Sequence, residues 1–147
     1  MPQATRTIVI ARPQAEVFAF FAEAENDPQW RGSVTMIKRD GPLASGTHYT
    51  HRVAGPGGRE IPADFEITEY EPDVKVVFRG VSGPVRPDGS YTFSAVEGGT
   101  SVTFSLSAEL TGMRKVLMGK PVQKAMDGEM ASLDKAKTIL ESNTGGQ

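Results

Sequence analysis

Frequent glycines and prolines between residues 34 and 110 constrain this chain more than any other feature of its sequence. They divide the region into short segments in which apolar and polar residues alternate, and a period of two is typical of strands with one buried face. The predicted strands span about 34–39, 47–53, 59–70, 75–81, 86–96 and 99–110. Because the breaks between them are short, consecutive strands should pair antiparallel, as a meander with one covered side and one side facing water.

A helix is predicted on each side of this meander. A β-branched strand over 5–11 leads into Pro13, which suits the first turn of a helix, and an apolar stripe then continues to about Asn26. The C-terminal segment carries a second stripe that should cover the sheet: Val122, Ala125, Met126, Leu133, Ala136 and Leu140. Pro121 predicts a kink or a new helix start, with a separate turn or short helix over 112–120. Residues 143–147 are expected to fray.

Composition narrows the class of protein and the kinds of site. The 147 residues suit a single domain over 1–147, and a net charge of -2 provides no positive field for nucleic acid. Cysteine is absent, and His48 and His51 would point to opposite faces of one strand, so we expect no metal and no cofactor. With no long apolar run and no secretory signal, we predict a cytoplasmic protein, monomeric or homodimeric, without membrane insertion.

Several local motifs stand in a characteristic order along nearly the whole chain. They are the strand-to-helix opening Ile8 to Pro13 with Val17 and Phe18, the turn Asn26 to Trp30, the pair Gly46-Thr47 and the ending Leu133 to Glu141. In this order and spacing they resemble the START-like, or SRPBCC, superfamily with its helix-grip fold, and in particular its polyketide cyclase/dehydrase and lipid-transport family. One departure is Glu23, because this family often has an aspartate at the end of the first helix.

The resemblance implies an α+β protein in which a curved seven-stranded antiparallel sheet wraps around a long C-terminal helix, with one or two short helices after the first strand. It also implies a cavity between sheet and helix for a hydrophobic or amphipathic small molecule, either polyketide-like or lipid-like. Members of the superfamily include lipid carriers and polyketide cyclases, so the fold alone does not select a function.

Three polar residues are predicted to face this cavity, and each has a structural alternative. Glu129 lies within the apolar stripe of the last helix, where it could act as a general acid, pair with an inward arginine such as Arg79, or reach water at the rim. His51 shares the apolar face of its strand with Tyr49 and could transfer protons, or simply form a hydrogen-bonded wall. Tyr91 could position a ligand carbonyl or cap a backbone group.

Apolar contacts to a ligand are expected from seven inward side chains: Trp30, Tyr49, Phe65, Phe78, Phe93, Phe104 and Met126. Trp30 could equally close one end of the core, and Met126 could be ordinary core filler. An inward set of small residues could leave room unfilled: Ala63, Gly80, Ala95, Ala108, Ala125 and Ala136.

A basic stretch precedes and enters the last helix, with Arg114, Lys115, Lys120 and Lys124. We interpret it as a solvated face, because no large exposed apolar stripe is expected beside Lys120 and Lys124.

The sequence favours two functions. The first is binding of a hydrophobic small molecule without catalysis. The second is a cyclase or dehydratase that acts on a poly-carbonyl substrate without cofactor, with His51, Tyr91 and Glu129 moving protons. Binding ranks narrowly first, because the polar candidates are few. A third function, as a protein-interaction module, would require an exposed apolar patch that the sequence does not reveal.

Overall fold

The computed structural model describes residues 2–142, and its elements follow the predicted order. Strand β1 (Gln3–Ile10) leads into helix α1 (Gln14–Ala22) and the 3-10 helix η1 (Ala24–Gln29). The strands that follow are β2 (Val34–Asp40), β3 (His48–Ala54), β4 (Glu60–Pro62), β5 (Phe65–Glu71), β6 (Lys75–Gly80), β7 (Asp88–Val96) and β8 (Gly99–Ser107), with the short helix η2 (Pro56–Gly58) between β3 and β4. The last element is helix α2 (Gly112–Ser142).

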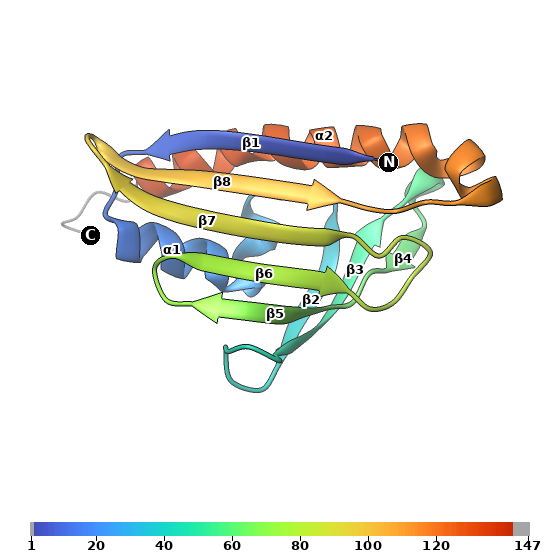
Figure 1. The fold of residues 1–147 in the computed structure, drawn as a ribbon, viewed down its shortest axis with the longest axis horizontal. Coiled ribbons are helices and arrows are strands. Elements are labelled where there is room, and N and C mark those ends of the chain that lie inside the picture. Colours follow the sequence, from blue (N-terminus) through green and yellow to red (C-terminus); the bar gives the residue numbers. More distant parts are fainter. Residues whose placement is uncertain (1, 143–147) are drawn as a thin grey trace.

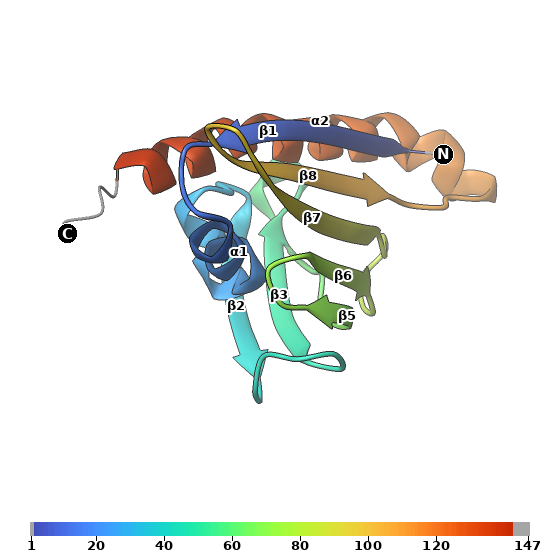
Figure 2. The ribbon, with the colours of Figure 1, turned by 60° about the vertical axis from the view of Figure 1, so that its left-hand side comes forward.

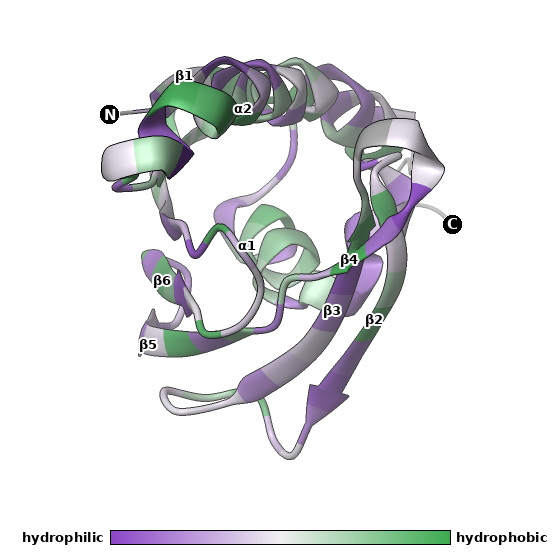
Figure 3. Cartoon of the chain, turned by 90° about the vertical axis from the view of Figure 1, so that its right-hand side faces the viewer, coloured by the Kyte–Doolittle hydropathy of each residue, from purple (hydrophilic) through white to green (hydrophobic). Residues whose placement is uncertain are grey.

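Seven strands form one continuous antiparallel path in the order β1-β8-β7-β6-β5-β3-β2, and the short β4 pairs with β3. Helix α2 lies along β1 (Figure 1), while β2 and β3 run across the direction of β7 and β8 (Figure 2). Seen along α2 from its N-terminal end, the sheet curls around the interior with α2 on one side and α1 beyond (Figure 3). The molecule therefore has the predicted α+β helix-grip fold.

The predicted strand 59–70 is in fact two strands, β4 and β5, with a break at Ala63 and Asp64. The Asp64 carboxylate accepts a hydrogen bond from the His51 backbone N–H at 2.9 Å, and the Asp64 N–H donates to Ser82 Oγ at 2.9 Å. These side-chain bonds take the place of backbone bonds between strands. The strand therefore breaks here, and β4 and β5 pair with different stretches of β3.

The two predicted helix boundaries also differ from the structure. Helix α1 ends at Ala22 and not near Asn26, because the Asn26 side chain donates to the Phe20 carbonyl at 3.0 Å and closes the helix end. Helix α2 is continuous from Gly112 through Pro121, so the predicted separate segment is wrong. Pro121 removes one helical hydrogen bond, and its would-be acceptor is the carbonyl of Leu117, an exposed residue that water can reach.

The core is concentrated at the α1 end of the molecule. Buried aromatic and aliphatic side chains of α1, β7, β8 and the C-terminal half of α2 pack there: Phe18, Phe21, Phe93, Val102, Leu133 and Leu140. Ala95 and Ala125, which we expected to face inward, are exposed. Ala95 lies near the end of β7, and Ala125 lies at the edge of the α2 stripe, whose buried side continues through Met126 and Met130. Residues 143–147, predicted to fray, lie outside the described part.

Candidate functional site

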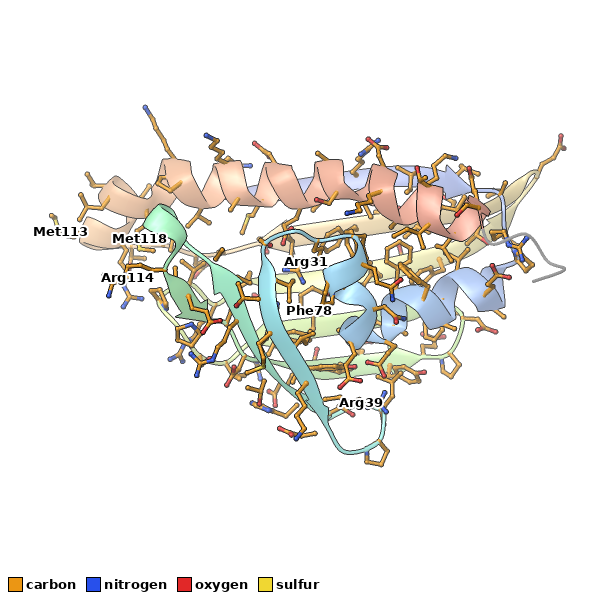
Figure 4. The ribbon with its side chains drawn as sticks, turned by 180° about the vertical axis from the view of Figure 1, so that it is seen from behind. Arg31, Arg39, Phe78, Met113, Arg114 and Met118 are labelled. Atoms are coloured by element: carbon orange, nitrogen blue, oxygen red, sulfur yellow. The ribbon has the colours of Figure 1, made fainter. Side chains whose placement is uncertain are left out.

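A buried ion cluster joins the turn after η1 to helix α2. Arg31 Nη1 lies 2.8 Å from Asp27 Oδ2, and its Nη2 and Nε lie 2.7 and 2.8 Å from Glu129 Oε2. Ser33 Oγ donates to the same Glu129 oxygen at 3.4 Å. Glu129 thus has a partner, as one of our alternatives required, but the partner is Arg31 and not Arg79, which pairs with Glu66. Figure 4 shows Arg31 in the middle of the molecule, between α2 and the strands.

Burial dominates the electrostatics of this cluster. Asp27 is only 4% exposed, and removal from water raises the pKa of its carboxyl to about 6 even though Arg31 opposes the shift. Burial alone would lower the pKa of Arg31, but Glu129 and Asp27 outweigh it and hold that pKa above its ordinary value. Among the described residues, Asp27 Oδ1 has no hydrogen-bond partner. The cluster therefore holds a permanently charged Arg31, and Asp27 Oδ1 can still accept a hydrogen bond.

His51 lies on the inward face of β3, with its ring against Phe65 at 5.2 Å between centroids. Its Nδ1 lies 2.9 Å from the Ala63 carbonyl oxygen, which can only accept, so Nδ1 carries the proton and Nε2 is the bare nitrogen. Burial, assisted by the charge of Arg31, lowers the pKa of His51 to about 4. At neutral pH His51 is thus an uncharged hydrogen-bond acceptor, and Nε2 has no partner within residues 2–142.

Tyr91 enters the same region from β7, stacked on Phe104 with 4.6 Å between ring centroids. Burial, together with the negative charges of Asp27 and Glu129, raises the pKa of its hydroxyl well above the ordinary value, so the group remains a neutral donor. The buried Trp30 Nε1 is a further donor, and it has no hydrogen-bond partner within residues 2–142. Among the described residues the interior therefore holds one donor and two acceptors without a well-formed hydrogen bond, and buried polar groups are rarely left so.

Six of the seven apolar candidates are buried, and one is half-exposed. Trp30 is 1% exposed and packs between Phe21 and Phe104, as a core residue would. Tyr49 is also fully buried, and its hydroxyl already donates to Glu23 Oε2 at 2.9 Å. The other buried candidates are Phe65, Phe93, Phe104 and Met126. Phe78 is the exception, because it packs against the core yet remains half-exposed.

Phe78 belongs to a group of apolar residues near the N-terminal half of α2 that remain half-exposed. Strand alternation points Val53 the same way as Tyr49 and His51, and Leu106 the same way as Phe104, yet both are only partly covered. Met118 of α2 is partly covered as well. Figure 4 places Phe78 in the interior and Met118 at the end where α2 begins. The interior is thus packed at the α1 end and less completely filled at this end.

A shallow groove of about 330 Å³ lies on the other side of the sheet. It is lined by residues of β1, β6, β7 and β8, including Thr5, Ser90 and Ser105. These residues alternate with Tyr91 and Phe104 along their strands, so the groove opens on the outer face. It is separate from the buried polar groups.

Asp27 and Arg31 are the site residues that sequence reasoning missed. The two residues are four positions apart, with Trp30 between them, and an acidic and a basic residue at this spacing can pair across one helical turn. This spacing was the signal that could have revealed them. Within residues 2–142 the structure has no group of three acidic, histidine or cysteine side chains that could hold a metal. No helix in that range is both long enough and apolar enough to cross a membrane.

Chemically, the arrangement can bind and orient a polar group but offers little strong acid or base. A carbonyl or hydroxyl oxygen placed among these groups could accept from Tyr91 or Trp30, and a hydroxyl could also donate to His51 Nε2. A histidine with a pKa of about 4 is a weak base, and Glu129 is committed to Arg31.

Comparisons with known proteins agree with this architecture. The sequence profile described as polyketide cyclase / dehydrase and lipid transport matches residues 1–138. The structure is similar to that of TTHA0849 from Thermus thermophilus, with a TM-score of 0.80, 19% identity, and coverage of 98% of this chain and 100% of that chain. A START superfamily protein from Mycobacterium smegmatis gives a TM-score of 0.76 at 13% identity, covering 97% of this chain and 99% of the other.

A third similar structure is the di-domain ARO/CYC StfQ from the steffimycin biosynthetic pathway, with a TM-score of 0.78 and 15% identity. The match covers 97% of this chain and 52% of StfQ, which corresponds to about one of its two domains. No match was found among the curated proteins. At these identities the solved structures establish the fold and leave the ligand to be argued from the site.

Proposed function

This chain belongs to the polyketide cyclase/dehydrase and lipid-transport family, and from that premise we propose that it binds an amphipathic small molecule between the sheet and α2. The observation that carries the proposal is His51 Nε2, a buried acceptor that has no hydrogen-bond partner among residues 2–142. Trp30 Nε1 and Asp27 Oδ1 also lack a well-formed hydrogen bond, although the Trp30 N–H is near enough to Asp27 to lower the pKa of its carboxyl. An unpaired buried polar group costs about 1–3 kcal/mol, so a ligand that pairs with these atoms would recover part of that cost.

The proposed ligand has an apolar body and a polar end. Its body would lie against Phe78, Leu106 and Met118, the half-exposed side chains near the start of α2. Its polar end would reach Tyr91 and His51, which are neutral at physiological pH and prefer an uncharged carbonyl or hydroxyl. This chemistry fits polyketide-like and lipid-like molecules, the classes that the family resemblance implied.

A matched pair of tyrosine variants tests the proposal. Titration with the neutral fluorescent ketone prodan, which has an apolar body and a carbonyl, should give saturable binding to the wild type. Tyr91→Phe should weaken this binding about fivefold, because one hydrogen bond is worth about 1 kcal/mol. Tyr70→Phe is the control, since Tyr70 contacts Phe18 at the packed α1 end. Equal affinities for the wild type and both variants would argue against this site. Native mass spectrometry of freshly purified protein identifies any copurified compound.

A cyclase or dehydratase activity at the same site is the second candidate. The observation that favours it is the pairing of a neutral acceptor, His51, with a neutral donor, Tyr91, in a water-poor interior. Because Glu129 is paired with Arg31, we assign it a positioning role at this site in place of the acid–base role that was one of its predicted alternatives. Incubation with a short poly-β-ketone thioester, followed by mass spectrometry for loss of one water, should show turnover that His51→Ala abolishes. Binding without turnover would leave the carrier function.

A further inference from the structure

The N-terminal turns of α2 expose an apolar stripe that packing within the fold does not use. Met113, Val116 and Leu117 are 70%, 77% and 66% exposed, and their spacing places them on one side of the helix. This observation corrects the expectation that no exposed apolar stripe adjoins the basic residues. The hydrophobic colouring on the near turns of α2 in Figure 3 marks the same region.

Farther along α2, the same helix face carries positively charged side chains. Lys120 and Lys124 follow Val116 and Leu117 by one and two turns, and both are exposed. Residues 112–126 contain four basic residues and no acidic residue, in a chain whose net charge is -2. An apolar tip followed by lysines on one face is the pattern of a helix that lies at a membrane interface.

Stability of the fold does not explain this distribution of charge. Cations in the first turn of a helix oppose its macrodipole, and α2 has Arg114 and Lys115 there with no acidic residue. Within the described chain, Lys115, Lys120 and Lys124 form no salt bridge, in contrast to Lys137 farther along the helix, which pairs with Glu141. The basic residues are therefore free to meet an external anion.

The stripe lies at the end of the interior where the apolar side chains are only partly covered. Arg114 Nη1 donates to the Pro84 carbonyl at 2.8 Å, which links the start of α2 to the loop between β6 and β7. Figure 4 shows Met113, Arg114 and Met118 together at this end. A surface that contacts the stripe would thus face the side from which the proposed ligand space is reached.

We propose that the first turns of α2 dock on an anionic lipid bilayer, with Met113, Val116 and Leu117 entering the headgroup region and Lys120 and Lys124 contacting anionic headgroups. A second copy of this chain is disfavoured as the occupant, because two identical basic faces would repel each other. An acidic protein is a poorer fit, because aromatic side chains, which are typical of protein interfaces, are absent from the stripe. The docking proposal does not depend on which small molecule the interior binds.

Vesicle co-sedimentation tests the proposal directly. The wild type should pellet with phosphatidylcholine vesicles containing about a third phosphatidylglycerol and not with pure phosphatidylcholine, and high salt should release it. Met113→Ser/Val116→Ser/Leu117→Ser should abolish pelleting. Lys120→Glu/Lys124→Glu should weaken it at least tenfold, because each lysine is worth about fivefold in partitioning.

Matched controls come from exposed residues elsewhere on the surface. Val96→Ser and Val74→Ser alter exposed valines away from α2, and Lys38→Glu/Lys135→Glu applies the same charge change on β2 and on the C-terminal half of α2. All of these should pellet like the wild type, and thermal unfolding checks that every variant is folded. Failure of the wild type to pellet, or equal losses in the Lys38/Lys135 control, would overturn the proposal. It would also be overturned if sedimentation equilibrium showed that the wild type is a dimer and that the serine variants are monomers. Binding of an acidic peptide to the stripe, without binding to vesicles, would overturn it as well.

Discussion

Among single residues, Asp27 and His51 affect stability in opposite directions over the same pH range. The pKa of Asp27 is raised from 3.8 to about 6, so the folded state holds this proton more tightly, and the resulting stability is lost as pH rises through about 6. The pKa of His51 is lowered from 6.5 to about 4, so unfolding takes up a proton, and stability is lost as pH falls from about 6.5 to 4. In the wild type the two effects largely cancel.

Single variants should therefore reveal each effect separately. Between pH 7 and 4.5, Asp27→Asn should lose about 2 kcal/mol more of its free energy of unfolding than the wild type does, because only the His51 effect remains. His51→Gln should gain about as much relative to the wild type over the same interval. Urea unfolding at the two pH values measures both, and the double variant should return to the wild-type dependence. A shift in the same direction for both single variants would contradict this account.

The partner of Glu129 shows how far single residues could be predicted. Its place in the apolar stripe of α2 was enough to require a partner, because an isolated buried carboxylate is costly. The identity of that partner was not predictable, since Arg31 is 98 residues away and reaches Glu129 only because η1 turns the chain inward. Local alternation was sufficient for His51, whose position depends on its own strand.

At the scale of elements, α2 is a helix whose sequence weakens it. Gly119, Pro121 and Gly128 all lie within its 31 residues, and each has a lower helix propensity than alanine. A Cβ added at Gly128 would have nothing within 4 Å, so Gly128→Ala should raise the free energy of unfolding by about 0.5–1 kcal/mol. Urea denaturation measures the change. Gly112→Ala is the control and should destabilise, because Gly112 has φ +59; stabilisation by both substitutions would refute the propensity argument.

The mispredicted elements share one cause. In each, groups distant in sequence or water take the place of backbone hydrogen bonds within the element. Alternation predicted the strands well, but it continued through Ala63 because nothing local revealed that Asp64 would bond to the His51 backbone. Proline rules predicted a break at Pro121, whereas an exposed helix can tolerate the loss of one hydrogen bond. Order and type of element were thus predictable, while boundaries depended on contacts that only the folded chain forms.

At the scale of the whole molecule, the sheet grips α2 unevenly. Several polar contacts hold its C-terminal half, among them Arg6 with Met130 O and with Asp134, Lys137 with Val9 O, the Ala11 N–H with Glu141, and Arg31 with Glu129. The N-terminal half has fewer ties, chiefly Gln123 with Gln3 and Arg114 with Pro84. The apolar stripe on that half is exposed as well, so little tertiary packing supports its helical hydrogen bonds.

This asymmetry predicts a gradient of local stability along one continuous helix. In native-state hydrogen exchange, amides of residues 128–140 should exchange at least tenfold more slowly than those of 115–124, because opening the gripped half requires breaking the core whereas opening the free half does not. Glu129→Gln should extend fast exchange toward the C-terminal half, since the ion pair that ties α2 to Arg31 is lost. Ser132→Ala should not, because the Ser132 hydroxyl bonds only within the helix, to the Gly128 carbonyl. Uniform protection along α2 would mean that the helix opens as one unit, and the first turns could then not respond independently to a membrane or a ligand.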